Sequence, residues 1–158
     1  MTPAPTAHIR DSRLTHEEAV AVAGIWRRAW SSARRDSVVL EPIGHWLARV
    51  KAEFGPPSEL RLLEREKQVL GFMVLHTAHR YVAQLYVDRH VQGQGLGRKL
   101  IDEASRRMPE GWKLHVALDN VNAQHFYARC GLTPGAIDRH PGTGVPRVAY
   151  HCDPGNER

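Results

Sequence analysis

The fold of this chain is decided by the stretch Gln92-Gly93-Gln94-Gly95-Leu96-Gly97-Arg98. Three glycines within five residues allow the backbone to approach a ligand closely and to adopt φ angles that other residues avoid. An apolar segment that ends at Val87 precedes the stretch, and an amphipathic pattern with helical spacing begins at about Gly95. The N-terminus of a helix attracts anions through its unpaired N–H groups and its dipole. The stretch therefore predicts an anion site suited to a pyrophosphate, with a glycine-rich turn that binds no ligand as the alternative.

The spacing of the glycines excludes two other phosphate-binding loops. The Walker loop needs the pattern G-x-x-x-x-G-K-[ST], which this sequence does not contain. The dinucleotide fingerprint G-x-G-x-x-G needs its third glycine one residue later than Gly97.

Apolar periodicity on both sides of the loop predicts a mixed α/β domain with one sheet. The helix after residues 15–18 starts with a capping box, in which Thr15 and Glu18 satisfy each other's backbone N–H groups. Three sequential strands before the loop favour an antiparallel meander. The expected elements are a strand near 8–10, helices after 15–18 and from about 42 to 54, strands near 60–62, 69–75 and 81–87, a helix over 95–108, a strand over 112–118, a short helix over 122–130, and strands near 132 and over 146–151.

Length and composition set the protein class. The 158 residues, 42% apolar and 25% charged, predict a single domain over residues 1–158, with residues 1–6 loose. No apolar run approaches the roughly 18 residues of a membrane span, and the first residues lack the hydrophobic stretch of a signal peptide. A cytoplasmic location without membrane association is expected, with Cys130 and Cys152 as free thiols.

The net charge of +5 favours an anionic partner without selecting one. The arginines form short pairs on expected helices, and no basic run of five to eight residues occurs. A nucleic-acid-binding module is therefore a weak alternative, no nucleic acid is expected as a partner, and no metal site is expected.

Two motifs resemble those of the GNAT superfamily of N-acetyltransferases. Gln92-x-x-Gly95-x-Gly97 matches its Q/R-x-x-G-x-G/A motif, and the preceding residues 84–88 are similar to its fourth strand. Residues 122–132, NAQHFYARCGL, resemble its second signature, N-x-x-A-x-x-F-Y-x-x-x-G-F. Asn122 directly precedes Ala123, and Leu132 replaces the usual Phe. The order of elements from Ala7 to His151 fits that fold throughout.

The resemblance implies an α/β (α+β) fold with a single mixed, mostly antiparallel sheet, helices on both faces, and a fourth and fifth strand that splay apart. It implies acetyl-CoA as co-substrate, with the pyrophosphate on backbone N–H groups of residues 93–98 and the pantetheine arm paired with the fourth strand. Asn122 would hydrogen-bond that arm and is also suited to cap its helix. The cofactor-binding residues that it implies are Leu85, Tyr86, Val87, Gln92, Gly93, Gln94, Gly95, Leu96, Gly97, Arg98, Asn122 and Phe126.

The resemblance also implies catalytic roles. Tyr127 would be the general acid, because a phenol stays protonated at neutral pH and can protonate the departing CoA sulfur. A core tyrosine beside Phe126 is the alternative. Many family members carry a glutamate base in the fourth strand, but here that strand has no acid before Asp88 at its end. His79, His115 or Asp119 could relay the proton through water, and His79 is the candidate base.

The acceptor is an amine whose class stays open between a small amine, an amino acid or antibiotic, and a protein N-terminus or lysine. Trp26, Trp30, Trp46 and Phe54 are candidates to line its pocket, although aromatic residues at helical spacing also suit a core. The expected loop Gly135–Pro146, with Asp138, Arg139 and His140, would border it. A catalytically inactive acyl-CoA sensor of the same fold is the second hypothesis, and the resemblance allows a homodimer.

Overall fold

The computed structural model describes residues 5–33 and 40–155 of the chain. Of the expected loose start, residues 1–4 lie outside the described residues, and residues 5–7 precede the first strand without regular structure. The elements are β1 (His8–Asp11), α1 (His16–Ala33), α2 (Ile43–Glu53), β2 (Glu59–Arg65), β3 (Gln68–His76), η1 (Thr77–His79), β4 (Tyr81–Val87), η2 (Arg89–Val91), α3 (Leu96–Arg107), β5 (Trp112–Ala117), α4 (Val121–Arg129), β6 (Thr133–Arg139) and β7 (Pro146–Cys152).

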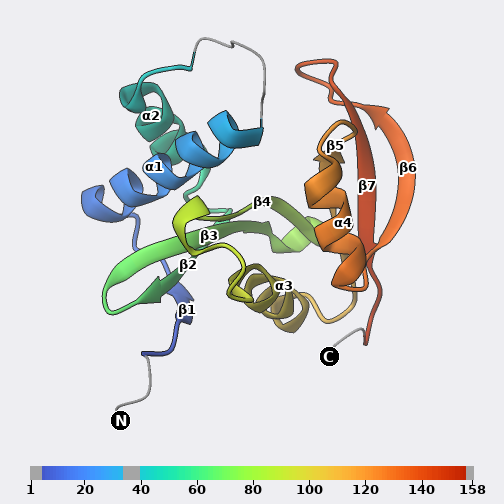
Figure 1. Cartoon of the computed structure of the whole chain (residues 1–158), viewed down its shortest axis with the longest axis horizontal. Helices are drawn as coiled ribbons and strands as arrows, with labels where there is room; N and C mark the ends of the chain where they lie inside the picture. Colours follow the sequence, from blue (N-terminus) through green and yellow to red (C-terminus); the bar gives the residue numbers. More distant parts are fainter. Residues whose placement is uncertain (1–4, 34–39, 156–158) are drawn as a thin grey trace.

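The sheet has seven strands in the order β1-β2-β3-β4-β5-β7-β6 (Figure 1). All neighbours pair antiparallel except β4 and β5, which run parallel. The expected single mixed, mostly antiparallel sheet is therefore confirmed. Helix α3 makes the crossover between the two parallel strands, as such a connection requires.

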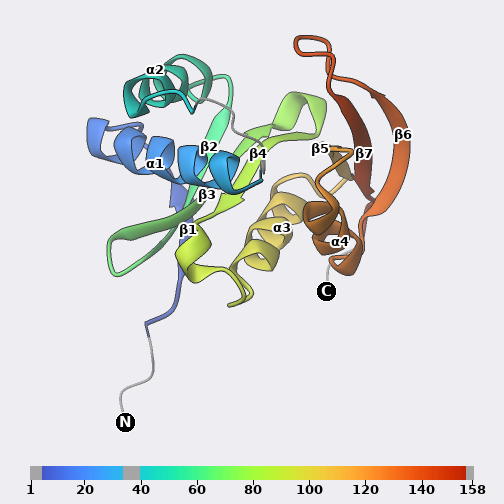
Figure 2. The same cartoon turned by 45° about the horizontal axis from the view of Figure 1, so that its top comes forward.

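Helices cover both faces of the sheet, as expected (Figure 2). Helices α1 and α2 pack on one face, around a core that includes Trp26, Val50 and Phe72. Helix α3 packs on the other face, where Leu100 and Tyr127 belong to a second core. The sheet thus separates two apolar layers, and each layer removes the apolar side of its helices from water.

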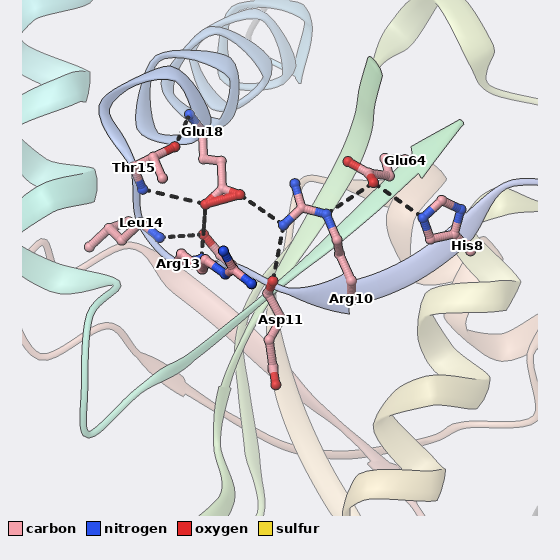
Figure 3. A network of polar contacts seen from close by, with 9 residues as sticks. His8, Arg10, Asp11, Arg13, Leu14, Thr15, Glu18 and Glu64 are labelled. Carbon is pink, nitrogen blue, oxygen red and sulfur yellow. Dashed lines mark hydrogen bonds and ion pairs between the residues drawn. The ribbon is translucent and has the colours of Figure 1, made fainter. Parts of the chain in front are cut away.

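The start of α1 is fixed by a network of polar contacts (Figure 3). The capping box is confirmed, because Thr15 Oγ1 accepts from the Glu18 N–H at 3.2 Å and the Thr15 N–H donates to Glu18 Oε1 at 3.4 Å. Arg10 on β1 donates to Glu18 at 2.8 Å and pairs with Glu64 on β2 at 3.0 Å. The hydrogen bond from Arg10 holds the pKa of Glu64 below its usual value. One arginine therefore ties the helix to two strands.

Helix α4 starts one residue earlier than expected, and its cap differs. Asn120, not Asn122, is the N-cap, and its Oδ1 accepts from the Ala123 N–H at 3.3 Å. An N-cap side chain reaches the N–H two or three residues ahead, so the correct cap is set by where the chain leaves β5. Asn122 is exposed in the first turn.

The expected loop Gly135–Pro146 is wrong over its first half, because β6 continues to Arg139. Pro134 and Gly135 disfavour a strand interior, and the β6–β7 register shifts between Pro134 and Ile137. An edge strand tolerates such a bulge, and pairing with β7 extends the strand beyond it. Asp138 and Arg139 therefore lie on a strand, and only residues 140–145 connect it to β7.

Gly71 on β3 is required by the close approach of β4. A Cβ at this position would meet the carbonyl oxygen of Tyr86 at 2.7 Å and the Cα of Val87 at 3.3 Å. These are backbone atoms, so Gly71→Ala is expected to lower the free energy of unfolding by about 1–3 kcal/mol, as overpacking does. Gly44→Ala on α2 is the matched control, because a Cβ there meets nothing within 4 Å. Denaturant unfolding measures both, and equal stabilities would contradict the contact.

Candidate active site

The glycine-rich stretch connects β4 to α3 and adopts the backbone that its composition predicts. Gly93 and Gly95 have φ angles of 83° and 78°, in the left-handed region that favours glycine. A Cβ built at either residue meets nothing within 4 Å, so the space beside the loop is open to a ligand. The loop thus has room for the predicted pyrophosphate.

The N-terminus of α3 supplies hydrogen-bond donors to this space. The helix begins at Leu96 without a side-chain cap, and its first helical bond runs from the Lys99 N–H to the Gly95 carbonyl at 3.3 Å. The N–H groups of Leu96, Gly97 and Arg98 therefore have no partner within the helix. Together with the helix dipole they make a site whose chemistry fits a pyrophosphate.

Three side-chain hydrogen bonds connect the glycine-rich stretch to neighbouring parts of the chain. Gln92 donates to the Val87 carbonyl at 3.2 Å, and Arg65 donates to the Gln94 side chain at 3.2 Å. Arg98 donates to the Arg129 carbonyl at 3.4 Å, which places its guanidinium between α3 and the end of α4. Gln92, Gln94 and Arg98 of the motif are therefore tied to neighbouring parts of the chain.

An ion pair that the sequence did not reveal fixes the end of β4. Arg28 on α1 donates to Asp88 at 2.9 Å, directly after the last residue of the strand. The two residues are 60 positions apart, so no local pattern predicts the pair. It anchors the segment that leads into the glycine loop.

Strands β4 and β5 separate after a single residue pair. Tyr81 pairs with Lys113, and the remaining residues of the two strands are not in register with each other. The expected splay is thus confirmed, and the backbone of Leu85 and Val87 lies along the opening. A register shift between Val74 and Leu75 on β3 leaves Ala83 of β4 without a partner and bends the strand where the opening begins.

Tyr127 lies in the core on the α3 side of the sheet and interacts electrostatically with Tyr86 on β4. It is 9% exposed, and its ring contacts Phe126 at 5.3 Å and Tyr150 at 6.1 Å between centroids. Burial raises the pKa of Tyr127 far above its ordinary value, so the phenol keeps its proton at neutral pH. Phe126 lies against the loop, since a Cβ on Gly97 would meet its ring at 2.8 Å.

The candidate bases lie in different places. His79 is exposed in η1, before the paired end of β4, and lines a surface hollow with Trp112 and Asp153. The structure therefore does not bring His79 to the opening between β4 and β5. Asp119 is exposed in the turn after β5. His115 is half-buried on β5, and its Nδ1 lies 2.7 Å from the Tyr81 hydroxyl.

The candidate pocket aromatics form part of the core between α1 and α2. Trp26 and Trp46 are each 3% exposed, with ring centroids 5.0 Å apart, and Phe54 packs on Trp26 at 4.9 Å. Their side chains support the α1–α2 unit from inside and do not reach its surface. Trp30 is partly buried and lies 5.7 Å from Trp46, nearer the end of α1.

A sequence profile of the Acetyltransferase (GNAT) family matches residues 19–132. The chain belongs to this family. The match spans most of α1, the strands β4 and β5, the glycine loop between β4 and α3, and α4, which carries Tyr127. This GNAT acetyltransferase is therefore an acyltransferase that uses acetyl-CoA as co-substrate, and its expected family, fold and enzyme class are confirmed.

The relatives that this chain resembles are also N-acetyltransferases. Peptidyl-lysine N-acetyltransferase YjaB of Salmonella typhimurium is 30% identical over 126 residues, which are 79% of this chain and 82% of the relative. The Escherichia coli K12 protein of the same name is 33% identical over 125 residues, 78% of this chain and 80% of the relative. The solution structure of the apo form of Escherichia coli YjaB has a TM-score of 0.73 at 28% identity, over 92% of this chain and 97% of that one.

A more distant structure carries the co-substrate. An acetyltransferase from Bacillus anthracis, in complex with acetyl coenzyme A, has a TM-score of 0.55 at 22% identity over 61% of this chain and 63% of that one. Within residues 5–33 and 40–155, no group of three or more metal-ligating side chains could hold an ion. No helix in the same part of the chain is long and apolar enough to cross a bilayer.

Proposed function

We propose that this GNAT acetyltransferase acetylates lysine side chains of proteins by direct attack of the amine on the thioester of acetyl-CoA. The observation that carries the proposal is the 30% identity, over 79% of the chain, to a peptidyl-lysine N-acetyltransferase. Strand β6 adds support, because it forms one edge of the sheet and all seven of its residues are exposed. An exposed edge can pair with an extended peptide.

The residues would share the work as follows. Backbone N–H groups of residues 93–98 hold the pyrophosphate, and the backbone of Leu85 and Val87 pairs with the pantetheine arm, which Asn122 also contacts. Tyr86, Gln92 and Phe126 complete the surroundings of the co-substrate. A backbone N–H beside the opening polarises the thioester carbonyl.

The transfer forms the bond between the amine nitrogen and the acetyl carbon and breaks the bond between that carbon and the CoA sulfur. Tyr127 gives its hydroxyl proton to the departing sulfur. The Tyr127 ring belongs to the core on the α3 side of the sheet, which holds the phenol in place. A buried phenol with a raised pKa suits this role.

The acceptor amine would approach over the face of the sheet that carries α1 and α2. Trp30 and residues 140–145 would border the acceptor site, and the buried Trp26 and Trp46 would support α1 and α2 beneath it. The proposed location is the cytoplasm, where protein lysines are plentiful.

Two further expectations stay predictions: that the protein forms a homodimer, and that it has no nucleic-acid or membrane partner.

Peptides that differ only in the available amine test the acceptor class. One peptide has a blocked N-terminus and a central lysine, the second has a free N-terminus and arginine in place of lysine, and a polyamine represents small acceptors. We expect mass spectrometry to find one added acetyl group on the lysine peptide alone. Transfer only to the free N-terminus, or only to the polyamine, would refute the lysine proposal and select the corresponding alternative. Acetyl-CoA binding without any transfer would identify an inactive sensor.

A further inference from the structure

A row of three polar rings crosses the middle of the sheet. His76 ends β3, Tyr81 begins β4 and His115 lies within β5, and their ring centroids are 6.2 Å and 5.5 Å apart in that order. The Tyr81 hydroxyl and His115 Nδ1 are 2.7 Å apart, a hydrogen-bond distance. All three side chains are partly exposed, so the row is accessible to a ligand.

The Tyr81–His115 pair lies where β4 and β5 begin to separate. Tyr81 is the β4 residue that pairs with β5, and the opening starts after it. Its neighbour Val82, and Leu114 beside His115, belong to the core on the α3 side. Because successive side chains of a strand alternate between faces, Tyr81 and His115 lie on the opposite face, which carries α1 and α2.

Tyr127 and the Tyr81–His115 pair therefore lie on opposite faces of the sheet. Tyr127 belongs to the core on the α3 side, together with Val82 and Leu114. The two faces suit the two proton steps of acetyl transfer, since the sulfur must gain a proton and the acceptor ammonium must lose one.

Burial and the charged groups around His115 favour its uncharged ring, whose free nitrogen can accept a proton. Burial and Arg147 on β7 lower the pKa of His115, Lys113 and His151 act in the same direction, and Asp138 on β6 opposes them. Asp138 is itself paired with Arg147 at 2.7 Å.

Tyr81 responds to the same surroundings. Burial raises its pKa, with Arg147 acting against the shift and Asp138 adding to it, so the hydroxyl keeps its proton at neutral pH. The pair thus combines a protonated phenol with an uncharged imidazole. His76 faces Tyr81 from β3.

We propose that Tyr81 and His115 form a proton relay that deprotonates the acceptor amine. The ammonium loses one N–H bond to the Tyr81 oxygen, while the Tyr81 O–H bond breaks and its proton binds His115 Nδ1. The products are a neutral amine, a neutral tyrosine and an imidazolium, so charge and protons balance. His115 is partly exposed and then releases its proton to water. The relay rests on acetyl transfer to an amine and not on lysine as the acceptor.

The test measures turnover against pH for Tyr81→Phe, His115→Ala and the double variant, with whichever amine the wild type acetylates fastest. His45→Ala, which removes an exposed histidine on α2, is the control. Each single variant is expected to lose about 10²-fold in kcat near pH 7, in the range of general-base effects. The double variant is expected to lose no more than either single one, because the two residues act in series. The loss of kcat in each variant is expected to become smaller as the pH rises, because the amine then loses its proton without a base.

Thermal shift with acetyl-CoA checks that each variant still folds and binds the donor. His115→Gln replaces His115→Ala if the smaller side chain lowers the melting temperature. Wild-type turnover in Tyr81→Phe or His115→Ala, or a deficit of the same size at every pH, would overturn the relay. A wild type that acetylates no amine would overturn acetyl transfer and the relay together, whereas loss of the lysine preference alone would leave the relay intact.

Discussion

Gly95→Asp is expected to abolish acetyl-CoA binding. The substitution places a carboxylate in the open space beside the loop, at the N-terminus of α3, where the co-substrate would bring its own negative charge. Two like charges at that distance repel, and the side chain also fills the space that a pyrophosphate needs. A thermal-shift titration measures the effect. A ligand at about 100 times its Kd adds roughly 2.7 kcal/mol to the stability of the wild type, and this gain is expected to vanish in the variant.

Gly155→Asp is the matched control for this experiment. Its φ of 77° is close to the 78° of Gly95, and a Cβ there also meets nothing within 4 Å. The two substitutions therefore carry the same backbone cost and differ in their distance from the loop. A wild-type shift in Gly155→Asp with none in Gly95→Asp supports the pyrophosphate site. Unchanged acetyl-CoA affinity in Gly95→Asp would refute it.

Tyr127→Phe is expected to lower kcat by about 10²-fold or more while leaving acetyl-CoA affinity nearly unchanged, as loss of a general acid does. The ring and its packing against Phe126 stay in place, and only the hydroxyl is removed. Initial rates at saturating acetyl-CoA, together with a thermal-shift titration, separate the chemical step from binding.

Tyr150→Phe provides a comparison in the same core. This second buried tyrosine lies 6.1 Å from Tyr127, and its hydroxyl donates to Gln124 at 3.4 Å. Its loss is expected to change stability slightly and turnover little. Equal turnover in Tyr127→Phe and the wild type would assign Tyr127 to packing, and equal losses in both variants would indicate a general disturbance of the core.

Much of the fold was predictable from local signals. The glycine loop, the capping box of Thr15 and Glu18 and the helix stop before Gly55 each depend on a few consecutive residues. Two expectations were wrong, the loop from Gly135 and the cap of α4. In both places a strand overrides the structural preference of the local residues. Strand β6 passes through Pro134 and Gly135 because β7 pairs with it, and the correct cap of α4 depends on where β5 ends.

The sequence by itself determined the family and the backbone of the glycine loop, because both depend on short motifs of consecutive residues. The binding of a pyrophosphate to this loop and the role of Tyr127 stay predictions. The tertiary structure alone decided which titratable groups meet at the opening. His79 is close to β4 in sequence yet lies outside the opening, whereas His115, 34 positions from Tyr81, comes within hydrogen-bond distance of it. The physical reason is that the register of two parallel strands, joined through a helix, sets which side chains become neighbours, and no local pattern encodes that register.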